Sequence, residues 1–311
     1  MSTTQKYRLV TRSDFDGLVC AVLLKELDMI DEIKFVHPKD MQDGKIAITN
    51  NDISTNLPYV EGVHLAFDHH FSETLRHPKI KRNHIIDPYA PSAARVLYKY
   101  YGGQEKFPQI SDAMMEAVDK SDSAQFSQAE ILHPENWVLL NFIMDSRTGL
   151  GRFKEFTVSN YQLMMELIDY CKNHKIEEIL ELPDVKERVD LYFDQEEQFQ
   201  KQIQRCAKVY DNLVVLDLRN EDTIYAGNRF AIYALFPECN ISIHALWGQK
   251  KQNTVFAVGK SIFNKTSQTN IGQLMLKYGG GGHQNAGTCQ IDNDKASKVL
   301  KELIAQMEQD S

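Results

Sequence analysis

The triplet Asp68-His69-His70 directly follows the apolar run from Val63 to Phe67, which is typical of a buried strand. Imidazole is a common metal ligand, and a metal-bound histidine usually has an acidic or carbonyl partner behind its ring. An acid beside two histidines at the end of a strand therefore favours the binding of a divalent metal ion. The alternative is a polar surface turn.

A pair of acids lies near the N-terminus, where Asp14 and Asp16 stand two residues apart in a loop closed by Gly17. In an extended loop alternate side chains point the same way, so both carboxylates can face one pocket. A short Asp-x-Asp-Gly motif also occurs by chance. The structural alternative is an acid at a helix N-cap, where the helix dipole favours negative charge.

Three further acids follow predicted elements. Asp52 comes shortly after a strand predicted at Lys45 to Thr49, although a turn residue is its simplest interpretation. Asp119 and Asp122 end a helix that begins near Ser111. The dipole disfavours acids at a helix C-terminus, so a bound cation would explain them, as would a solvated loop. We take Asp122 as the ligand and Asp119 as the reserve.

A glycine run from Gly279 to Gly282 precedes His283 near the C-terminus. Glycines let backbone N–H groups approach a phosphate closely, and the adjacent imidazole can donate a hydrogen bond to it. No Gly-Lys-Ser or Gly-Lys-Thr follows, so this is not a Walker loop. A flexible turn is the alternative. Anion contacts could also come from three other residues, which lie earlier in the chain: Arg229, Lys260 and Ser261.

The elements that must position these residues alternate between short β-rich runs and amphipathic helices over the first half of the chain, which predicts a parallel sheet covered on both faces. The predicted strands are Tyr7 to Thr11, Ile33 to Val36, Lys45 to Thr49 and Val63 to Phe67, and the predicted helices are Leu18 to Leu27 and Ser92 to Tyr101. Ligands of such folds bind at the carboxyl ends of the strands. The N-terminal acid pair, Asp52 and the histidine triplet all fall just beyond a predicted strand end.

The second half of the chain predicts a different unit. Residues 184–208 are charged, rich in glutamine and free of Gly and Pro, which favours one long helix. Beyond it we predict strands at Leu213 to Leu218, Ile232 to Leu235, Ile241 to Leu246 and Val255 to Val258, and a closing helix at Lys295 to Gln306. We therefore expect a first domain at 1–183, a connecting helix at 184–208 and a smaller α/β domain at 209–311.

Composition limits the classes of function. The chain has 311 residues and a net charge of -8, which argues against binding to long nucleic acid because that needs a broad basic surface. The five cysteines are scattered without a Cys-x-x-Cys pair, as expected of reduced thiols in a cytoplasmic protein. The N-terminus lacks an apolar signal segment, and the longest apolar run near it, Leu18 to Leu24, is too short to span a membrane.

Taken together, these motifs resemble the DHH phosphoesterase superfamily, named for the triplet found here at 68–70. The chain is similar to the branch with a glycine-rich loop and histidine in its C-terminal domain, which includes nano-RNases and exopolyphosphatase-like proteins. The motifs run in the right order over nearly the whole chain. The resemblance implies an α/β fold in which a parallel-sheet DHH domain is joined by a long helix to a smaller α/β domain, with the active site in the cleft between them.

The resemblance also implies metal ligands and a cofactor. Five residues match metal-binding positions: Asp14, Asp16, Asp52, His69 and Asp122. It implies two manganese ions, with magnesium as an alternative, because oxygen and imidazole ligands with open positions suit these metals. Family members commonly carry a histidine shortly before the first acid pair, but Val10 to Ser13 contains none. One ion would then have fewer protein ligands, or Arg12 would contact substrate phosphate.

The remaining matches concern the substrate. The resemblance implies that the catalytic residues are Asp68, His70 and His283: Asp68 supports His69, His70 faces the phosphate and His283 contacts substrate. The family's substrate-binding loop matches Gly280, Gly281, Gly282 and His283, and we add Arg12 and Arg229 to the predicted substrate-binding set.

The implied function is metal-dependent hydrolysis of a short linear nucleotide, such as the dinucleotide pGpG or a nano-RNA, to 5′-mononucleotides by a metal-bridged hydroxide. The alternatives are a short-chain exopolyphosphatase or pyrophosphatase, and a sensor that binds nucleotides without cutting them. We expect a small phosphorylated partner, no membrane, and a possible homodimer.

Overall fold

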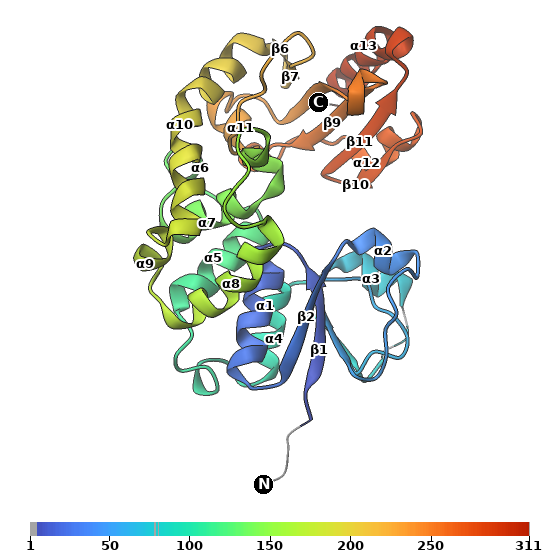
Figure 1. Ribbon diagram of the computed structural model, residues 1–311. Coiled ribbons are helices and arrows are strands. Elements are labelled where there is room, and N and C mark those ends of the chain that lie inside the picture. The colour runs from blue at the N-terminus through green and yellow to red at the C-terminus, as the bar shows by residue number, and fades with distance from the viewer. Residues whose placement is uncertain (1–4, 78, 80, 311) are drawn as a thin grey trace. The chain divides into compact units, whose positions relative to one another are not determined.

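A five-stranded sheet forms the centre of the first part of the chain (Figure 1). The computed structural model describes residues 5–77, 79 and 81–310. The strand order is β2-β1-β3-β4-β5, and every neighbouring pair is parallel, as the sequence predicted. The strands are β1 (Tyr7–Arg12), β2 (Ile30–Val36), β3 (Asp52–Thr55), β4 (Leu65–Asp68) and β5 (His84–Ile86).

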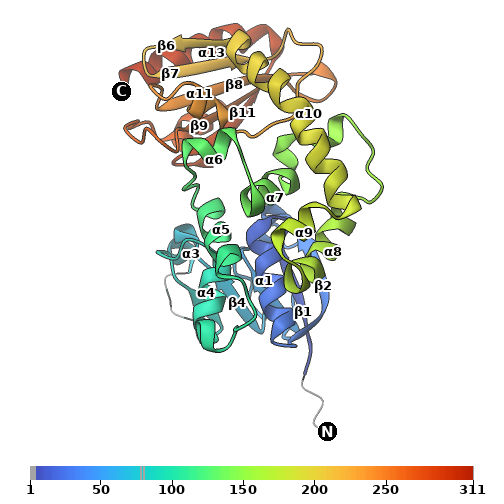
Figure 2. The ribbon, with the colours of Figure 1, turned by 90° about the vertical axis from the view of Figure 1, so that its left-hand side faces the viewer.

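Helices of this first unit pack on the sheet and on one another. Those described are α1 (Phe15–Glu26), α2 (Pro38–Gln42), α3 (Phe71–Arg76), α4 (Ala93–Tyr100), α5 (Asp112–Asp122), α7 (Asn136–Met144), α8 (Asn160–Asn173) and α9 (Ile176–Leu180), with a 3-10 turn η1 (Gly103–Glu105). Helices α1 and α4 lie side by side against the sheet in both ribbon views (Figures 1 and 2). Residues Leu18 to Leu24 of α1 are all fully buried, which anchors this helix in the core.

Two caps fix where these helices begin. The Asp14 side chain accepts a hydrogen bond from the Gly17 N–H at the start of α1, and the Ser92 side chain accepts one from the Arg95 N–H at the start of α4. Gly17 has a steric role, because a Cβ there would lie 2.0 Å from the Arg12 carbonyl oxygen. The turn between β1 and α1 therefore requires glycine at this position.

A six-stranded mixed sheet forms the second unit, in the order β10-β11-β9-β8-β7-β6. Its elements are β6 (Ala207–Tyr210), β7 (Leu213–Asp217), α11 (Ala231–Leu235), β8 (Ile241–Trp247), η4 (Gln249–Lys251), β9 (Thr254–Lys260), α12 (Ile271–Leu276), β10 (Gly281–His283), β11 (Ala286–Ile291) and α13 (Asn293–Gln309). The strands β7 and β8 are parallel, and the other neighbouring pairs are antiparallel. A core that includes Phe256, Met275 and Leu303 fills the space between sheet and helices.

The chain passes between the two units more than once. The first unit comprises Met1–Phe126, Pro134–Ser146 and Phe153–Asp190, and the second comprises Ser127–His133, Arg147–Arg152 and Leu191–Ser311. The second unit therefore also takes in α6 (Gln128–Leu132) and η3 (Leu150–Arg152), while η2 (Ser146–Thr148) lies at the change between units. The long helix α10 (Pro183–Cys206) contributes residues to both.

Two predicted strands were wrong. Residues 45–49 form no strand. The strand β3 begins only at Asp52, and all four of its residues are buried. The alternation of Ile46 and Ile48 reflects packing on a small apolar cluster, whereas an inner parallel strand is covered on both faces. Residues 232–235 lie in the helix α11. The prediction was wrong because a short apolar run does not distinguish a strand from a helix.

None of the helices in the described part of the chain combines the length and the apolar character that a membrane span needs.

Candidate metal centre

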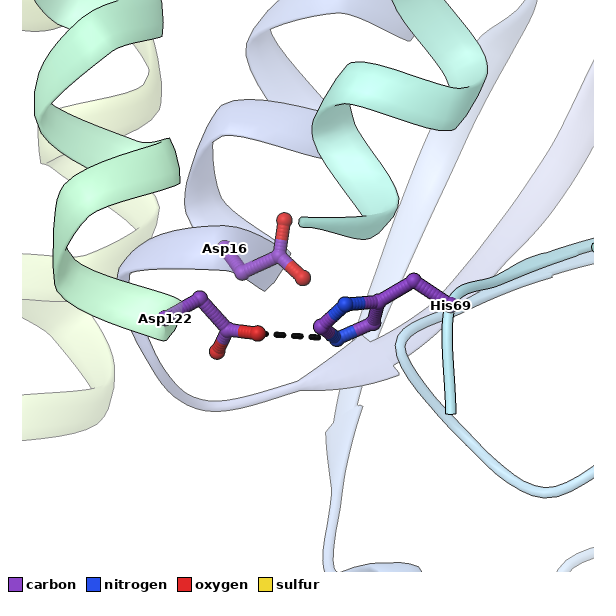
Figure 3. Close-up of side chains that lie close together, drawn as sticks. All are labelled: Asp16, His69 and Asp122. Atoms are coloured by element: carbon purple, nitrogen blue, oxygen red, sulfur yellow. Dashed lines mark ion pairs between the residues drawn. The ribbon is translucent and has the colours of Figure 1, made fainter. Parts of the chain in front are cut away.

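Three side chains from separate elements meet at the carboxyl edge of the parallel sheet (Figure 3). Asp16 lies in the first turn of α1, His69 follows β4, and Asp122 is the last residue of α5. One ligand atom from each lies within 4.8 Å of the other two. A single cation can therefore contact all three.

Asp16 is held in place by the N-terminus of α4. Its carboxylate accepts hydrogen bonds from the backbone N–H groups of Ala93, at 2.9 Å, and Ala94, at 2.8 Å. The side chain is buried, and this burial, followed by the nearby charge of Asp122, raises its pKa to about 8. Without a cation nearby, the negative charge of this buried carboxylate is therefore poorly stabilised.

His69 presents one ring nitrogen to these acids. Its Nδ1 lies 3.2 Å from the carbonyl oxygen of Ala90, and this contact fixes the ring. Its Nε2 lies 2.8 Å from Asp122 Oδ2, at ion-pair distance, and among the described residues this buried nitrogen has no hydrogen-bond partner of good geometry. A metal ion between Nε2 and the carboxylates would satisfy this atom, so the residues present fit a metal site.

Asp119 belongs to a different contact, although it lies one helical turn from Asp122. Its Oδ1 accepts a hydrogen bond from the Ser92 hydroxyl at 2.7 Å, and its Oδ2 accepts one from Arg95 Nε at 2.8 Å. The structure therefore brings Asp122, and not Asp119, to the cluster.

Asp68 holds His70 rather than the ring of His69. The buried Oδ1 of Asp68 lies 2.7 Å from His70 Nδ1 and accepts a hydrogen bond from the His69 backbone N–H at 2.8 Å. This corrects the expectation that Asp68 supports the His69 ring, whose partner is the Ala90 carbonyl. Burial lowers the pKa of His70, but the Asp68 carboxylate outweighs this effect and leaves it raised. The His70 ring remains 39% exposed.

Asp14 lies beside the cluster but faces hydrogen-bond donors and a cation. Its Oδ1 accepts from the Gly17 N–H at 2.9 Å, and both oxygens accept from Asn56 Nδ2, at 3.1 and 3.3 Å. The Arg12 Nε lies 2.9 Å from its Oδ2. Sequence reasoning missed Asn56, a buried residue that directly follows β3 and has a positive φ of 53°. Had β3 been predicted at its true position, a polar residue directly after its end would have pointed to Asn56.

The assignment of Asp52 as a metal ligand is corrected. Asp52 is the first residue of β3 and pairs in register with Arg8 near the start of β1, so it lies at the opposite end of the sheet from the cluster. Its carboxylate is occupied by Arg8 Nε at 2.6 Å and by the Thr49 N–H at 2.6 Å. The strand was placed several residues early in the sequence, so an acid at its start was taken for one beyond its end.

The glycine loop lies in the second unit, in and before β10. A Cβ at Gly280 would lie 2.1 Å from the Thr288 carbonyl oxygen, and one at Gly282 would lie 2.3 Å from the Ala286 carbonyl oxygen. These glycines let β10 lie close to β11. A Cβ at Gly281 would meet nothing within 4 Å, and this residue can face a ligand.

The other residues predicted to bind substrate from this unit are exposed. His283 ends β10 and pairs in register with Ala286. Arg229 lies just before α11, with its guanidinium over the Phe230 ring at 4.2 Å from the ring centroid.

Comparison with solved structures gives a full-length match. A pGpG-specific phosphodiesterase, PggH, from Vibrio cholerae is 63% identical, with 98% of this chain and 100% of that chain covered and a TM-score of 0.90. CDC45 from Entamoeba histolytica is 9% identical over 96% of this chain and 95% of that chain, with a TM-score of 0.50, and is alike in fold alone. No protein-family model and no curated protein matches the sequence.

Proposed function

This chain belongs to the DHH phosphoesterase superfamily, and we propose that it is a metal-dependent phosphodiesterase that hydrolyses short linear nucleotides, pGpG foremost, to 5′-mononucleotides. The observation that carries this proposal is the 63% identity to a pGpG-specific phosphodiesterase over 98% of the chain. The cluster of Asp16, His69 and Asp122 supports it, because phosphoryl transfer at neutral pH commonly uses a divalent cation.

In this proposal Asp16, His69 and Asp122 hold the metal ion. The ion supplies positive charge to the phosphoryl group and makes water more acidic. Two carboxylates and an imidazole suit manganese or magnesium better than a metal that prefers thiolates. Manganese remains a prediction from the family resemblance, and a cytoplasmic location and a homodimer remain predictions from the sequence.

His70 and Arg12 would handle the phosphate. With Nδ1 of His70 held by Asp68, its Nε2 is the ring nitrogen left for substrate, and a protonated ring can donate to a phosphoryl or leaving oxygen. The Arg12 side chain is 37% exposed next to Asp14 and can contact a phosphate oxygen from solvent. In the second unit, Gly281, His283 and Arg229 are the proposed substrate contacts.

The experiment that tests the function compares two substrates. Protein stripped of metal is given manganese and then offered pGpG and tripolyphosphate in parallel, with nucleotide and phosphate release measured separately. We expect GMP from pGpG and no phosphate from tripolyphosphate. Phosphate from tripolyphosphate alone would replace the proposal with a polyphosphatase. Binding of pGpG without either product would replace it with a nucleotide sensor.

A matched pair of variants ties turnover to the cluster. Asp122→Asn removes a charge from the proposed metal site, and we expect it to abolish turnover while the fold is retained. Asp119→Asn alters a neighbouring acid that pairs with Arg95, and we expect turnover to persist. Equal loss in both variants would contradict the assignment of Asp122.

A further inference from the structure

The surroundings of Asp14 differ from those of the three clustered ligands. Asp16, His69 and Asp122 direct a carboxylate oxygen, a ring nitrogen and a carboxylate oxygen toward one another. Asp14 instead contacts three donors: the Gly17 N–H, the Asn56 amide and the Arg12 guanidinium. Donors and a fixed cation are what a carboxylate needs when no metal ion binds it.

Asn56 stands where an acid would be needed for a second ion. Its Nδ2 contacts both oxygens of Asp14, and its buried Oδ1 has no hydrogen-bond partner in the part of the chain that the structure describes. Turning the amide to offer Oδ1 toward a cation beside Asp14 would give up both of those contacts. A neutral amide also supplies no charge to offset a second divalent cation.

The local charges balance with one divalent ion. Such an ion neutralises the carboxylates of Asp16 and Asp122, and the guanidinium of Arg12 neutralises Asp14. Asp68 is paired with His70. A second divalent ion next to Asp14 would meet the Arg12 guanidinium at close range and would leave excess positive charge in a partly buried site.

We infer that this site takes one divalent metal ion and that Arg12, held on Asp14, supplies the positive charge that a second ion would otherwise bring to the phosphate. The inference rests on the proposed function for the role of Arg12 toward phosphate, whereas the number of ions stands on the geometry alone. It replaces the expectation of two ions.

The number of ions is measured directly. Protein stripped with a chelator is loaded with manganese and desalted, and manganese per chain is determined by elemental analysis and by native mass spectrometry. We expect one ion per chain, and two ions would overturn the inference. The count needs no turnover, so one ion without pGpG hydrolysis would refute the proposed function and leave the inferred number of ions intact.

A gain of binding tests which residues exclude the second ion. The double variant Arg12→His/Asn56→Asp turns both groups facing Asp14 into metal ligands, and we expect it to bind a second manganese ion. Thermal denaturation with and without manganese checks that the variant is folded. A folded double variant that still binds one ion would refute the assignment of the exclusion to these residues.

A third measurement tests the role of Arg12 toward phosphate. Arg12→Gln should keep one manganese ion per chain and raise the KM for pGpG by about tenfold, roughly the loss of one charge-assisted hydrogen bond. Arg8→Gln is the matched control, because Arg8 also pairs with an aspartate but at the far end of the sheet. An unchanged KM in Arg12→Gln, or the same rise in both variants, would contradict the role of Arg12.

Discussion

Metal binding to this site should depend steeply on pH, because His69 must lose a proton before Nε2 can bind an ion. Burial lowers the pKa of His69, but the surrounding carboxylates, Asp122 foremost, outweigh this and raise it to about 9. Because pH 7 lies about two units below that pKa, removing the proton from His69 at pH 7 costs about 2.7 kcal/mol. The His69 proton alone should therefore make the metal affinity at pH 7 about 100-fold weaker than above pH 9.

The sign follows from competition between proton and metal ion. Lowering the pH fills Nε2 with a proton and weakens metal binding, by about tenfold per unit below the pKa. Asp16, whose pKa is raised to about 8, adds a second proton below that value and makes the fall steeper. Both protons are displaced when the ion binds at neutral pH.

Isothermal titration calorimetry measures this directly. Magnesium is titrated into stripped protein from pH 6 to 8.5 in buffers of different ionisation enthalpy, so that the protons released per ion can be counted. We expect between one and two protons released at pH 7 and fewer at pH 8.5. Asp52→Asn, which alters an acid outside the cluster, should release the same number. An affinity independent of pH, with no proton release at pH 7, would refute the reasoning.

Three further predictions concern stability. Gly282→Ala should lower the free energy of unfolding by about 2 kcal/mol or more, because its φ is 157° and the added Cβ would clash with β11. The control Gly281→Ala should lower it by less than about 0.5 kcal/mol, since a Cβ there meets nothing within 4 Å. Equal losses of the two variants in urea denaturation would contradict this. Asp52→Asn should lower the free energy of unfolding by about 2–3 kcal/mol, because the carboxylate is 2% exposed and paired with Arg8. The variant should still bind the same number of metal ions per chain, and loss of the ion would show that Asp52 is a ligand after all. Arg188→Ala should cost about 3–5 kcal/mol because the guanidinium is buried and donates to two carbonyls, and a change below about 1 kcal/mol in the same assay would be inconsistent with that burial.

Much of the first unit was predictable from the chain. The parallel arrangement followed from the alternation of strands and helices, and the caps at Asp14 and Ser92 were visible as residue types at helix starts. The strand β3 was missed because inner parallel strands lack the alternating pattern that marks a half-buried strand. That error moved one ligand prediction to Asp52 and hid Asn56.

The sequence alone limited the candidate metal ligands to carboxylates and imidazoles near the ends of predicted elements, but residue type did not separate true ligands from the helix-capping Asp14 and the ion-paired Asp52. Tertiary structure decided which of them meet. Asp16, His69 and Asp122 are far apart in the chain, and their distances depend on strand register and helix docking. Likewise, Asn56 reaches Asp14 only when β1 and β3 pair, because a local sequence pattern does not specify contacts between distant segments.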